Sequence, residues 1–353
     1  MPNLDDLVAL RSADPQQMGD RIAELPDQVQ AAWNLARKVP LPDSHRQATS
    51  IVAIGMGGSA VGADVVRGVT QADLKVPFTV WRDYGLPGFV GPETLVLALS
   101  HSGNTEETLS GFRAALDRGA KLVAITSGGA LGELARQHGV PLIQFQYASQ
   151  PRAALGYLFS LPLAVLVRLG YLDDLTAEVD RTIKLLGCLR STYGPDVPTS
   201  QNAAKRLAQR LHGRLAVIYG GGPYAVVAQR WKNQLNENSK SWGLFEALPE
   251  LNHNAVVGFE HPAELRRLLQ VILIGTAASP PRIQRRAQIT AQLLDRLGIS
   301  HTMVEGEGES DLERVMSSIY LGDYASYYLA MLNRVDPTQI EAINVLKEAL
   351  SRS

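Results

Sequence analysis

The sequence Ser100-His101-Ser102-Gly103-Asn104-Thr105 joins an apolar run, Thr94–Leu99, to a run of helix-forming residues, Glu106–Arg118. We interpret the first run as a buried strand and the second as a helix. The turn between them places hydroxyls and free backbone N–H groups at a helix N-terminus, which attracts anions. An ordinary helix cap needs one hydroxyl, whereas this turn has three, so it predicts a phosphate site. The hydroxyls belong to Ser100, Ser102 and Thr105.

Apolar runs on both sides of this turn alternate with helix-forming runs. Near-continuous apolar strands separated by helices are typical of a parallel sheet that is covered on both faces. We therefore predict such a sheet for this half of the chain. The predicted strands are Ile51–Ile54, Val76–Trp81, Thr94–Leu99, Lys121–Thr126 and Pro141–Phe145, and the predicted helices are a helix from Ser59 to about Val69, Glu106–Arg118, Leu131–His138 and the buried Leu155–Leu172.

The alternation restarts in the second half of the chain. A strand, a glycine turn and a helix stand at the head of both halves. We therefore predict an α/β fold of two similar subdomains, each an α-β-α sandwich with a parallel sheet. The hydroxyl turn has no counterpart after Leu268–Thr276, which predicts a single phosphate site, in the first half. The expected elements are the strands Leu215–Tyr219, Leu268–Ile274 and Thr302–Glu305 and the helices Tyr224–Leu235, Arg282–Leu297, Leu312–Leu332 and Ile340–Leu350.

The length of 353 residues exceeds what one ordinary core organises, so two domains are expected. We predict a helical N-terminal segment over residues 1–45, in which Gln16–Ala36 is amphipathic. A first subdomain with the phosphate site follows over 46–173, and a helical linker over 174–200. The second subdomain, with C-terminal helices, is expected over 201–353.

The composition argues against several classes of function. The formal net charge of −1 gives no overall basic excess to attract nucleic acid or an anionic membrane. Cys188 is the only cysteine, so an intramolecular disulfide and a cysteine metal cluster are excluded, which favours a cytoplasmic setting. The N-terminal residues lack the apolar core of a signal peptide, and Pro162 and Arg168 interrupt the run Leu155–Leu172 too strongly for a membrane span.

A glycine turn, Gly55-Met56-Gly57-Gly58-Ser59-Ala60, follows the first predicted strand. It fits the loose form of a dinucleotide fingerprint, with Ser59 as the expected cap of the next helix. The same glycines also let the backbone approach a sugar phosphate, or simply permit a tight turn. The hydroxyl turn counts against the dinucleotide, because a pyrophosphate cradle does not need three hydroxyls one strand away.

The segment Asn236–His253 supplies two candidates for proton transfer. Glu237 lies near the end of a predicted helix, in Asn236-Glu237-Asn238-Ser239-Lys240. An isolated glutamate there is usually a solvated charge, but the unusually polar neighbours favour a carboxylate that moves a proton between adjacent carbons. His253 lies between two asparagines. Most single histidines are structural, but an imidazole titrates near neutral pH and suits acid/base chemistry.

Three further residues stay open between a structural and a functional role. Arg152 opens the apolar helix, where a cation opposes the helix dipole, so it either forms a salt bridge or stabilises an anionic intermediate. From the residues alone, Lys347 is typical of a surface charge and Thr338 of a helix cap. The sequence has no histidine or cysteine spacing typical of a metal site, so we expect neither a metal nor a redox cofactor.

These motifs together resemble the sugar isomerase (SIS) superfamily, and within it the bifunctional phosphoglucose/phosphomannose isomerases. The resemblance extends from about Ile51 to Lys347. At His101 the sequence departs from that family, which often has an aromatic residue such as tyrosine there. The matching motifs are Gly57-Gly58-Ser59, Ser100-x-Ser102-Gly103-Asn104-Thr105, Pro151-Arg152-Ala153-Ala154-Leu155, Asn236-Glu237-Asn238-Ser239-Lys240 and Glu250-Leu251-Asn252-His253-Asn254.

The resemblance implies a homodimeric isomerase that interconverts glucose 6-phosphate and mannose 6-phosphate with fructose 6-phosphate through a cis-enediol. It implies that Glu237 shuttles the proton between C1 and C2, and that Arg152 stabilises the enediolate. The partner subunit's His253 would assist ring opening together with Lys347, and Thr338 is the candidate that leaves room for rotation about C2–C3. The residues implied to hold the substrate are Gly57, Gly58, Ser59, Ser100, Ser102 and Thr105.

Three alternatives to this enzyme stay open. A non-catalytic sugar-phosphate sensor can use the same fold, but it needs neither Glu237 nor His253. A form of this sensor that regulates through DNA would add a helix-turn-helix and a basic face, of which the first fifty residues show no clear example. An isomerase or synthase of amino-sugar phosphates would need a partner domain that supplies ammonia. A dinucleotide-dependent enzyme rests on the glycine turn alone.

Overall fold

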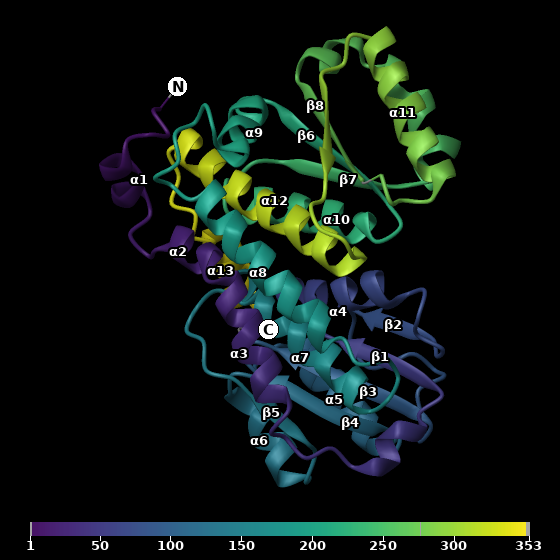
Figure 1. Cartoon of the computed structure of the whole chain (residues 1–353). Coiled ribbons are helices and arrows are strands. Elements are labelled where there is room, and N and C mark those ends of the chain that lie inside the picture. Colours follow the sequence, from purple (N-terminus) through teal and green to yellow (C-terminus); the bar gives the residue numbers. More distant parts are fainter. Residues whose placement is uncertain (1, 276, 351–353) are drawn as a thin grey trace. The chain divides into compact units, whose positions relative to one another are not determined.

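The computed structural model describes residues 2–275 and 277–350, which Figure 1 draws in sequence colours. These residues form two compact units, and each contains a parallel sheet covered by helices, which confirms the predicted α/β class. The first unit comprises Glu24–Gly187 and Gly308–Met316, and the second comprises the described residues of Met1–Ala23, Cys188–Glu307 and Ser317–Ser353. The segment boundaries at residues 45, 173 and 200 stay predictions.

The sheet of the first unit has five strands: β1 (Ser50–Ile54), β2 (Phe78–Trp81), β3 (Thr94–Ser100), β4 (Lys121–Thr126) and β5 (Leu142–Gln144). All five were predicted to within two residues at each end. They pair in parallel in the order β2-β1-β3-β4-β5. The order in which the chain adds strands to the sheet therefore reverses between β1 and β3. Open α/β sheets bind ligands in the crevice at the carboxyl ends of the two strands where this reversal occurs.

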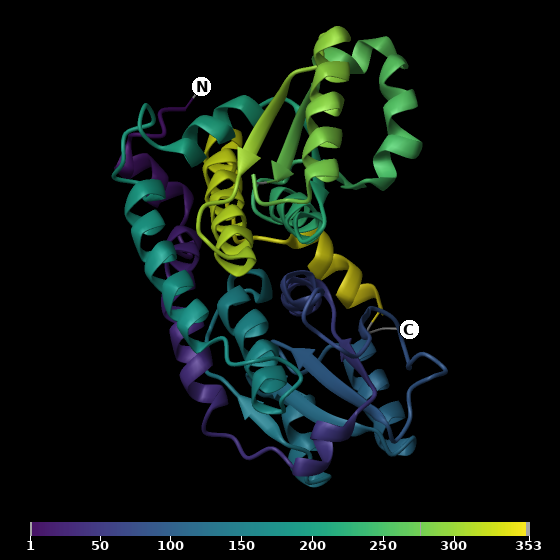
Figure 2. The same cartoon turned by 45° about the vertical axis from the view of Figure 1, so that its right-hand side comes forward.

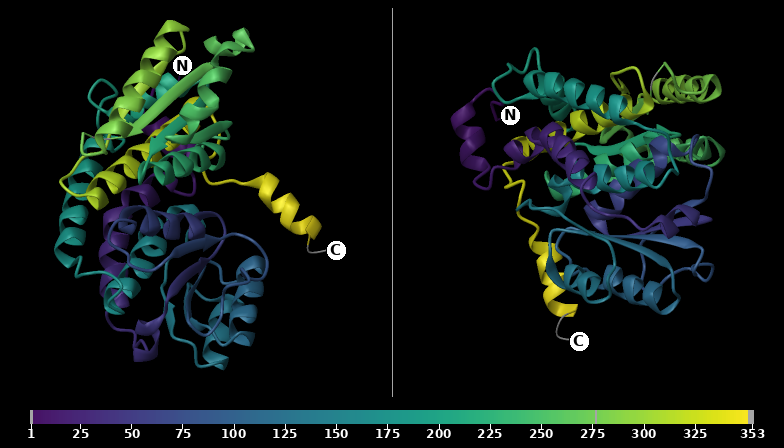
Figure 3. Two further views of the ribbon diagram at one scale, coloured as in Figure 1. Left: turned by 90° about the vertical axis from the view of Figure 1, so that its right-hand side faces the viewer. Right: turned by 60° about the horizontal axis from the view of Figure 1, so that its bottom comes forward.

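Five helices flank this sheet: α3 (Leu25–Ala36), α4 (Gly57–Thr70), α5 (Glu106–Asp117), α6 (Gly129–Gln137) and α7 (Leu155–Arg168). Alternate residues of β1, β3 and β4 pack with α5 and α6 in one core, which includes Phe112 and Leu131. The opposite face is covered by α4 and α7, and α3 packs on α7. Figure 3 shows the strands between these helical layers.

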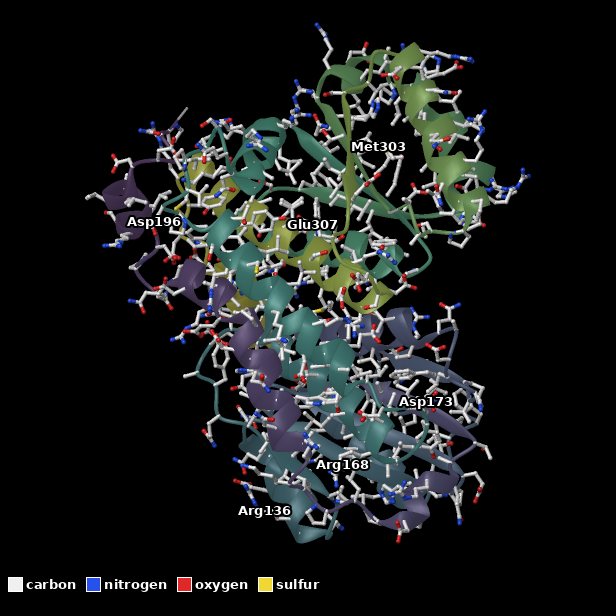
Figure 4. All side chains as sticks on the ribbon, viewed as in Figure 1. Arg136, Arg168, Asp173, Asp196, Met303 and Glu307 are labelled. Atoms are coloured by element: carbon white, nitrogen blue, oxygen red, sulfur yellow. The ribbon has the colours of Figure 1, made fainter. Side chains whose placement is uncertain are left out.

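The apolar run forms a buried helix as predicted, with Pro162 inside it, but α7 ends at Arg168 and does not extend to Leu172. At its end, the Nη1 of Arg168 donates hydrogen bonds to the carbonyl oxygens of Ala36 and, at 2.6 Å, of Val39 (Figure 4). A cation at the C-terminal end of a helix complements the helix dipole, so Arg168 stabilises the end of α3. Among the described helices, none is both long and apolar enough to cross a membrane.

The sheet of the second unit has four strands: β6 (Leu215–Gly221), β7 (Gly243–Leu248), β8 (Leu269–Gly275) and β9 (His301–Glu305). They pair in parallel in the order β7-β6-β8-β9, which repeats the order of β2-β1-β3-β4. The predicted similarity of the two halves is thereby confirmed. The edge strand β7 is missing from the predicted elements. Thr276, which the prediction of a single phosphate site includes, lies outside the described residues.

Two long helices cover this sheet, α10 (Tyr224–Glu237) and α11 (Pro281–Arg296), and most of a third, α12 (Asp311–Asn333), also belongs to this unit. On one face, Leu294 of α11 packs with the strands and with two short helices, η3 (Glu250–His253) and η4 (Ala255–Glu260). The other face is covered by α10, whose Trp231 is buried. Helix α12 lies beside α10 (Figure 2), and the contacts between these two helices bear on the functional site.

The remaining α-helices of the second unit include α1 (Leu7–Ala13) and α2 (Met18–Ala23) from the N-terminal part of the chain and α13 (Glu341–Leu350) from its C-terminal part. Helix α9 (Ala203–Leu211) comes from the middle of the chain, and α8 (Thr176–Tyr193) contributes residues to both units. The Nζ of Lys205, which is fully buried, donates to the carboxylate of Asp5 at 2.9 Å. This hydrogen bond lowers the pKa of Asp5. The hydroxyl of Tyr320 donates to the carbonyl oxygen of Ala23 at 3.0 Å. The N-terminal segment is thus tied to residues far along the chain.

Candidate functional site

The hydroxyl turn lies at the switch point of the first unit, directly after β3. The Oγ of Ser100 is 2.9 Å from the Oγ1 of Thr105 and accepts a hydrogen bond from the N–H of Gly103 at 3.0 Å. The Oγ of Ser102 accepts one from the N–H of Asn104 at 3.2 Å. Ser100 is buried and Ser102 is exposed, so the hydroxyls of the turn extend from the protein interior to its surface.

Thr105 immediately precedes α5, but its side chain does not cap the helix. Its Oγ1 pairs with Ser100 instead. The first backbone N–H groups of an α-helix have no partner within the helix, and the helix dipole makes them attractive to an anion. Thr105 therefore occupies the cap position of α5 without making the side-chain hydrogen bond of an ordinary cap, and the geometry favours an anion at this helix N-terminus.

The glycine turn after β1 begins α4 two residues earlier than predicted. Helix α4 starts at Gly57, whose φ of 49° lies in the left-handed region that glycine favours. Ser59 therefore lies inside the first helical turn, and the expectation that it caps the helix is wrong. Its buried Oγ accepts a hydrogen bond from the N–H of His101 at 3.2 Å. This bond joins the glycine turn to the hydroxyl turn.

The loop after β4, which contains Gly128 and Gly129, packs against the hydroxyl turn and was missed in the sequence. A Cβ on Gly103 would lie 1.8 Å from the carbonyl oxygen of Gly128, and one on Gly129 would lie 2.4 Å from that of Ser102. Only glycines allow the two loops to pack this closely. The signal that could have indicated them is the pair of adjacent glycines just after the predicted strand Lys121–Thr126.

His101 packs into the protein beneath the turn. Its Nε2 lies 3.1 Å from the carbonyl oxygen of Tyr147, and its ring meets that of Phe145 edge-on with 5.6 Å between centroids. Burial lowers the pKa of His101, because the charged imidazolium would lose its hydration. The imidazole is therefore neutral at pH 7, and His101 contributes packing to the turn without adding a positive charge.

Arg152 lies in the short helix η2 (Pro151–Ala153), which packs on the start of α4. Only 3% of its surface is exposed. A Cβ on Gly58 would lie 2.7 Å from the carbonyl oxygen of Pro151 and 2.9 Å from the backbone nitrogen of Arg152, so the approach requires a glycine. The structure thus brings Arg152 to the glycine turn of its own unit.

Gln28 of α3 fixes the segment that carries Arg152. Its Nε2 donates to the carbonyl oxygen of Ala153 at 2.9 Å, and its Oε1 accepts from the N–H of Gly156 at 3.0 Å. Both bonds are buried, so they hold the backbone on the C-terminal side of Arg152 in place. The sequence offers no local signal for Gln28, because its partners are more than a hundred residues away.

We expect Gly58→Ala to destabilise the first unit. The added methyl group would lie against two backbone atoms, which cannot turn aside as a side chain can. Overpacking of this kind costs about 1–3 kcal/mol. Thermal unfolding measures the loss, with Gly88→Ala as the control because Gly88 has open space around it. A melting temperature equal to that of the wild type would contradict the close approach of η2 to α4.

Glu237, in the second unit, is the last residue of α10 and is half-buried. The polar residues around it hold the end of this helix. The Nδ2 of Asn236 donates to the carbonyl oxygen of Ser241 at 2.8 Å, and the Nδ2 of Asn333 donates to that of Ser239 at 2.9 Å. The Asn236 amide, part of the segment that the sequence singles out, and the Asn333 amide of α12 therefore fix the backbone from which the Glu237 carboxylate projects.

Lys240 ties the end of α10 to the segment that carries Thr338. Its Nζ donates to the carbonyl oxygen of Glu237 at 2.9 Å and to that of Asp336 at 2.6 Å. The N–H of Thr338 donates to the carboxylate of Asp336 at 2.7 Å, and the Thr338 side chain is buried. Helix α13 begins only at Glu341, so the interpretation of Thr338 as a helix cap is wrong.

His253 ends the short helix η3, just beyond the carboxyl end of β7, and is exposed. The asparagines on either side are anchored. The Nδ2 of Asn252 donates to the hydroxyl of Thr290 at 2.9 Å, and the Nδ2 of Asn254 donates to the carboxylate of Glu250 at 2.8 Å. His253 is thus presented to the outside on a well-held segment.

Lys347 lies on α13, where no residue is buried. Figure 3 shows this helix, in yellow, projecting away from the rest of the second unit. In the described part of the chain, neither Lys347 nor His253 makes a side-chain hydrogen bond to Glu237. The second unit therefore brings Glu237 to the Thr338 segment and leaves the other two candidates on its exterior.

Comparison with known proteins relates the whole chain to one group of enzymes. A family model described as the bacterial phospho-glucose isomerase C-terminal SIS domain matches residues 200–350. A bifunctional phosphoglucose/phosphomannose isomerase from Caldicellulosiruptor bescii is 40% identical over 335 residues, which cover 95% of this chain and 99% of that protein. Another from Aquifex aeolicus is 36% identical over 303 residues, covering 86% and 90%.

Solved structures agree on the fold. A hypothetical protein from Thermus thermophilus superposes with a TM-score of 0.76 at 18% identity, covering 98% of this chain and 93% of that one. At this identity the likeness supports the architecture alone. The relatives named above match nearly the full length of both chains at a much higher identity. The chain therefore belongs to the bifunctional phosphoglucose/phosphomannose isomerase family.

Proposed function

We propose that this protein is an aldose–ketose isomerase that interconverts glucose 6-phosphate and mannose 6-phosphate with fructose 6-phosphate. Its relatives at 40% and 36% identity carry the name of this activity. Within the structure, the observation that supports the proposal most is the hydroxyl turn at the carboxyl ends of β1 and β3. A small phosphorylated substrate needs such an anchor.

The phosphate group binds at the N-termini of α4 and α5 in the first unit. Hydroxyls and backbone N–H groups donate to its oxygens, and the glycines let the backbone come close. The phosphate does not react, so its binding energy serves to orient the reacting carbons. The residues proposed to hold it are Gly57, Gly58, Ser59, Ser100, Ser102 and Thr105.

Glu237 is the base. Its carboxylate takes the proton from C2 of the open-chain aldose, and the electrons of that C–H bond form a cis-enediolate with negative charge on the oxygen at C1. The proton of the C2 hydroxyl passes to the oxygen at C1, and Glu237 returns the proton that it took to carbon C1. The products are a C1 hydroxyl and a C2 carbonyl, which together make the ketose. Arg152 stabilises the negative charge while it exists.

The protein acts as a homodimer in the cytoplasm. The partner subunit's His253 assists ring opening, and the exposure of this residue on an anchored segment supports such a donation. Lys347 helps at the ring oxygen. Thr338, on the segment tied to the end of α10, leaves room for rotation about C2–C3. This rotation lets the enediol receive its proton on either face, so that glucose and mannose phosphates both form.

A coupled assay of the purified protein tests the function. It follows fructose 6-phosphate formation from glucose 6-phosphate and, separately, from mannose 6-phosphate, in the presence of a chelator. Turnover of both substrates is expected. Turnover of glucose 6-phosphate alone would exclude the role of Thr338 in rotation. Absence of both activities would favour a non-catalytic sugar-phosphate sensor, since such a protein keeps the hydroxyl turn without needing Glu237.

We expect Thr105→Val to weaken phosphate anchoring. The substitution keeps the shape and removes a hydroxyl that meets the charged phosphate. A hydrogen bond to a charged group is worth about 1.5–3 kcal/mol, so KM should rise about 10- to 100-fold. Thr108→Val is the matched control on the same helix, because its buried hydroxyl has no hydrogen-bond partner among the described residues. Equal KM values for the two variants would contradict the role of Thr105.

A further inference from the structure

Helix α10, which ends at Glu237, is joined to α12 by a buried ion pair that the chemistry above does not use. The Nε of Arg230 donates to the Oδ1 of Asp323 at 3.0 Å, and the Nη2 of Arg230 donates to Oδ2 at 2.5 Å. The two side chains are only 3% and 6% exposed. This fork of two parallel hydrogen bonds fixes both the distance and the orientation of the two side chains.

Such a pair is a costly way to hold two helices together. Burial raises the pKa of Asp323, and the opposing effects of Arg230 and Gln234 only partly offset it. Replacing a buried ion pair by apolar residues is often neutral or stabilising, so stability alone does not explain its presence. What a forked pair adds over apolar packing is a single defined register between the helices.

Further contacts along the same two helices fix the same register. The Nε1 of Trp231 donates to the carbonyl oxygen of Ser318 at 2.9 Å. The indole lies so close to α12 that a Cβ on Gly322 would be 2.1 Å from it. The Nδ2 of Asn238 donates to the hydroxyl of Ser326 at 2.9 Å. A slip of α10 by one residue, about 1.5 Å, would break all of these contacts together.

We propose that Arg230 and Asp323 are positioning residues that set the register of α10 and thereby hold the Glu237 carboxylate at the reacting carbons. The inference rests on the proposed function of Glu237 as the base. Arg230 lies about two helical turns before Glu237, so both project from nearly the same side of α10. A displacement of the first is therefore transmitted along a rigid helix to the second.

The test removes both charges together in the double variant Arg230→Met/Asp323→Asn, which leaves no uncompensated charge in the interior. An error of about 1 Å in the position of a reacting group can cost about 10²-fold in rate, so we expect kcat to fall about 10- to 100-fold. We expect KM to change less than about twofold, because the phosphate anchor is untouched.

A second readout separates positioning from a general loss of structure. When the reaction runs in D2O, a misplaced base releases its proton to solvent more often before returning it, so the product gains more deuterium. We expect this fraction to rise in the double variant. The matched control is Lys205→Met/Asp5→Asn, which removes another ion pair of the same unit, one whose lysine is fully buried. It should lower the melting temperature and leave kcat and deuterium uptake unchanged.

The outcomes distinguish a failure of the proposed base from a failure of the proposed positioning role. If Glu237→Gln retains turnover, the proposed base is wrong. If Glu237→Gln is inactive while Arg230→Met/Asp323→Asn keeps the wild-type kcat and deuterium uptake, the positioning role is wrong. Should the double variant not fold, Arg230→Lys replaces it, since lysine keeps the charge but cannot form the fork. Wild-type kcat in a folded Arg230→Lys protein would then overturn the inference.

Discussion

Glu237→Gln is expected to lower kcat by about 10⁴-fold, the upper end of what a positioned general base contributes. Glutamine has nearly the same size and can occupy the same site at the end of α10, but its amide cannot accept the proton from C2. The hydrogen bonds that fix this helix end involve the backbone of Glu237 and the side chains of its neighbours, so they survive the substitution. Substrate binding should therefore change little.

The coupled assay measures the loss of turnover, and calorimetric titration with fructose 6-phosphate measures the retained binding. Glu246→Gln is the control, because it makes the same chemical change at an exposed position of the edge strand β7. Its kcat should equal that of the wild type. A Glu237→Gln protein that keeps more than a tenth of wild-type turnover would show that another group is the base.

Arg152→Met is expected to lower kcat by about 10²- to 10³-fold, the effect of removing one donor to a developing oxyanion. Methionine fills a similar volume in this buried position, so the packing of η2 on α4 is largely kept. The enediolate carries its negative charge only during the reaction. Loss of Arg152 should therefore lower kcat and kcat/KM by similar factors and change KM little.

Steady-state kinetics on both hexose phosphates provides the measurement, with unfolding by circular dichroism to verify the fold. Arg136→Met serves as the control: Arg136 is an exposed arginine of the same unit, labelled in Figure 4, whose Nη2 donates to Gln144 at 2.5 Å. It should leave kcat unchanged. A rise in KM at constant kcat for Arg152→Met would mean that Arg152 binds the phosphate and does not act on the enediolate.

The fold of the first unit could be predicted because local pattern alone decides it. Strand β3 is buried at every residue, so its apolar run has one interpretation. The hydroxyl turn, the helix after it and the parallel order all follow from that run and its neighbours. Ser59 shows the limit: a glycine with positive φ can begin a helix earlier than a serine cap suggests, and only the backbone shows which of the two occurs.

Strand β7 could not be predicted because its middle residues are exposed. Leu244, Phe245 and Glu246 are all exposed, so neither a buried run nor a clear alternation marks it. What makes it a strand is pairing with β6, which precedes it on the other side of α10. The polar residues after Glu237 favoured the interpretation of this segment as part of an active site, so no strand was predicted after them.

The motifs of the candidate site could be predicted, but the contacts that hold them could not. Gln28 bonds to Ala153 across 125 positions, and Arg230 bonds to Asp323 across 93. The residues next to a glutamine or an arginine on a helix do not predict a hydrogen-bond partner so far away in the sequence. The roles of Gln28 and Arg230 are visible only in the folded structure, whereas Glu237 and Arg152 lie in short motifs that can be recognised in the sequence.

Because the second unit unites both ends of the chain, its assembly has a fixed order in the cell. Asp5 and Ala23 contact Lys205 and Tyr320, which follow them by 200 and 297 positions. Ribosomes add about 5–20 residues per second, so the N-terminal segment waits about 15–60 seconds for its last partners. During that interval Glu24–Gly187 can already collapse around its own sheet. The residues of this N-terminal segment are thus made long before they are buried, and until then their apolar side chains are open to chaperones and proteases.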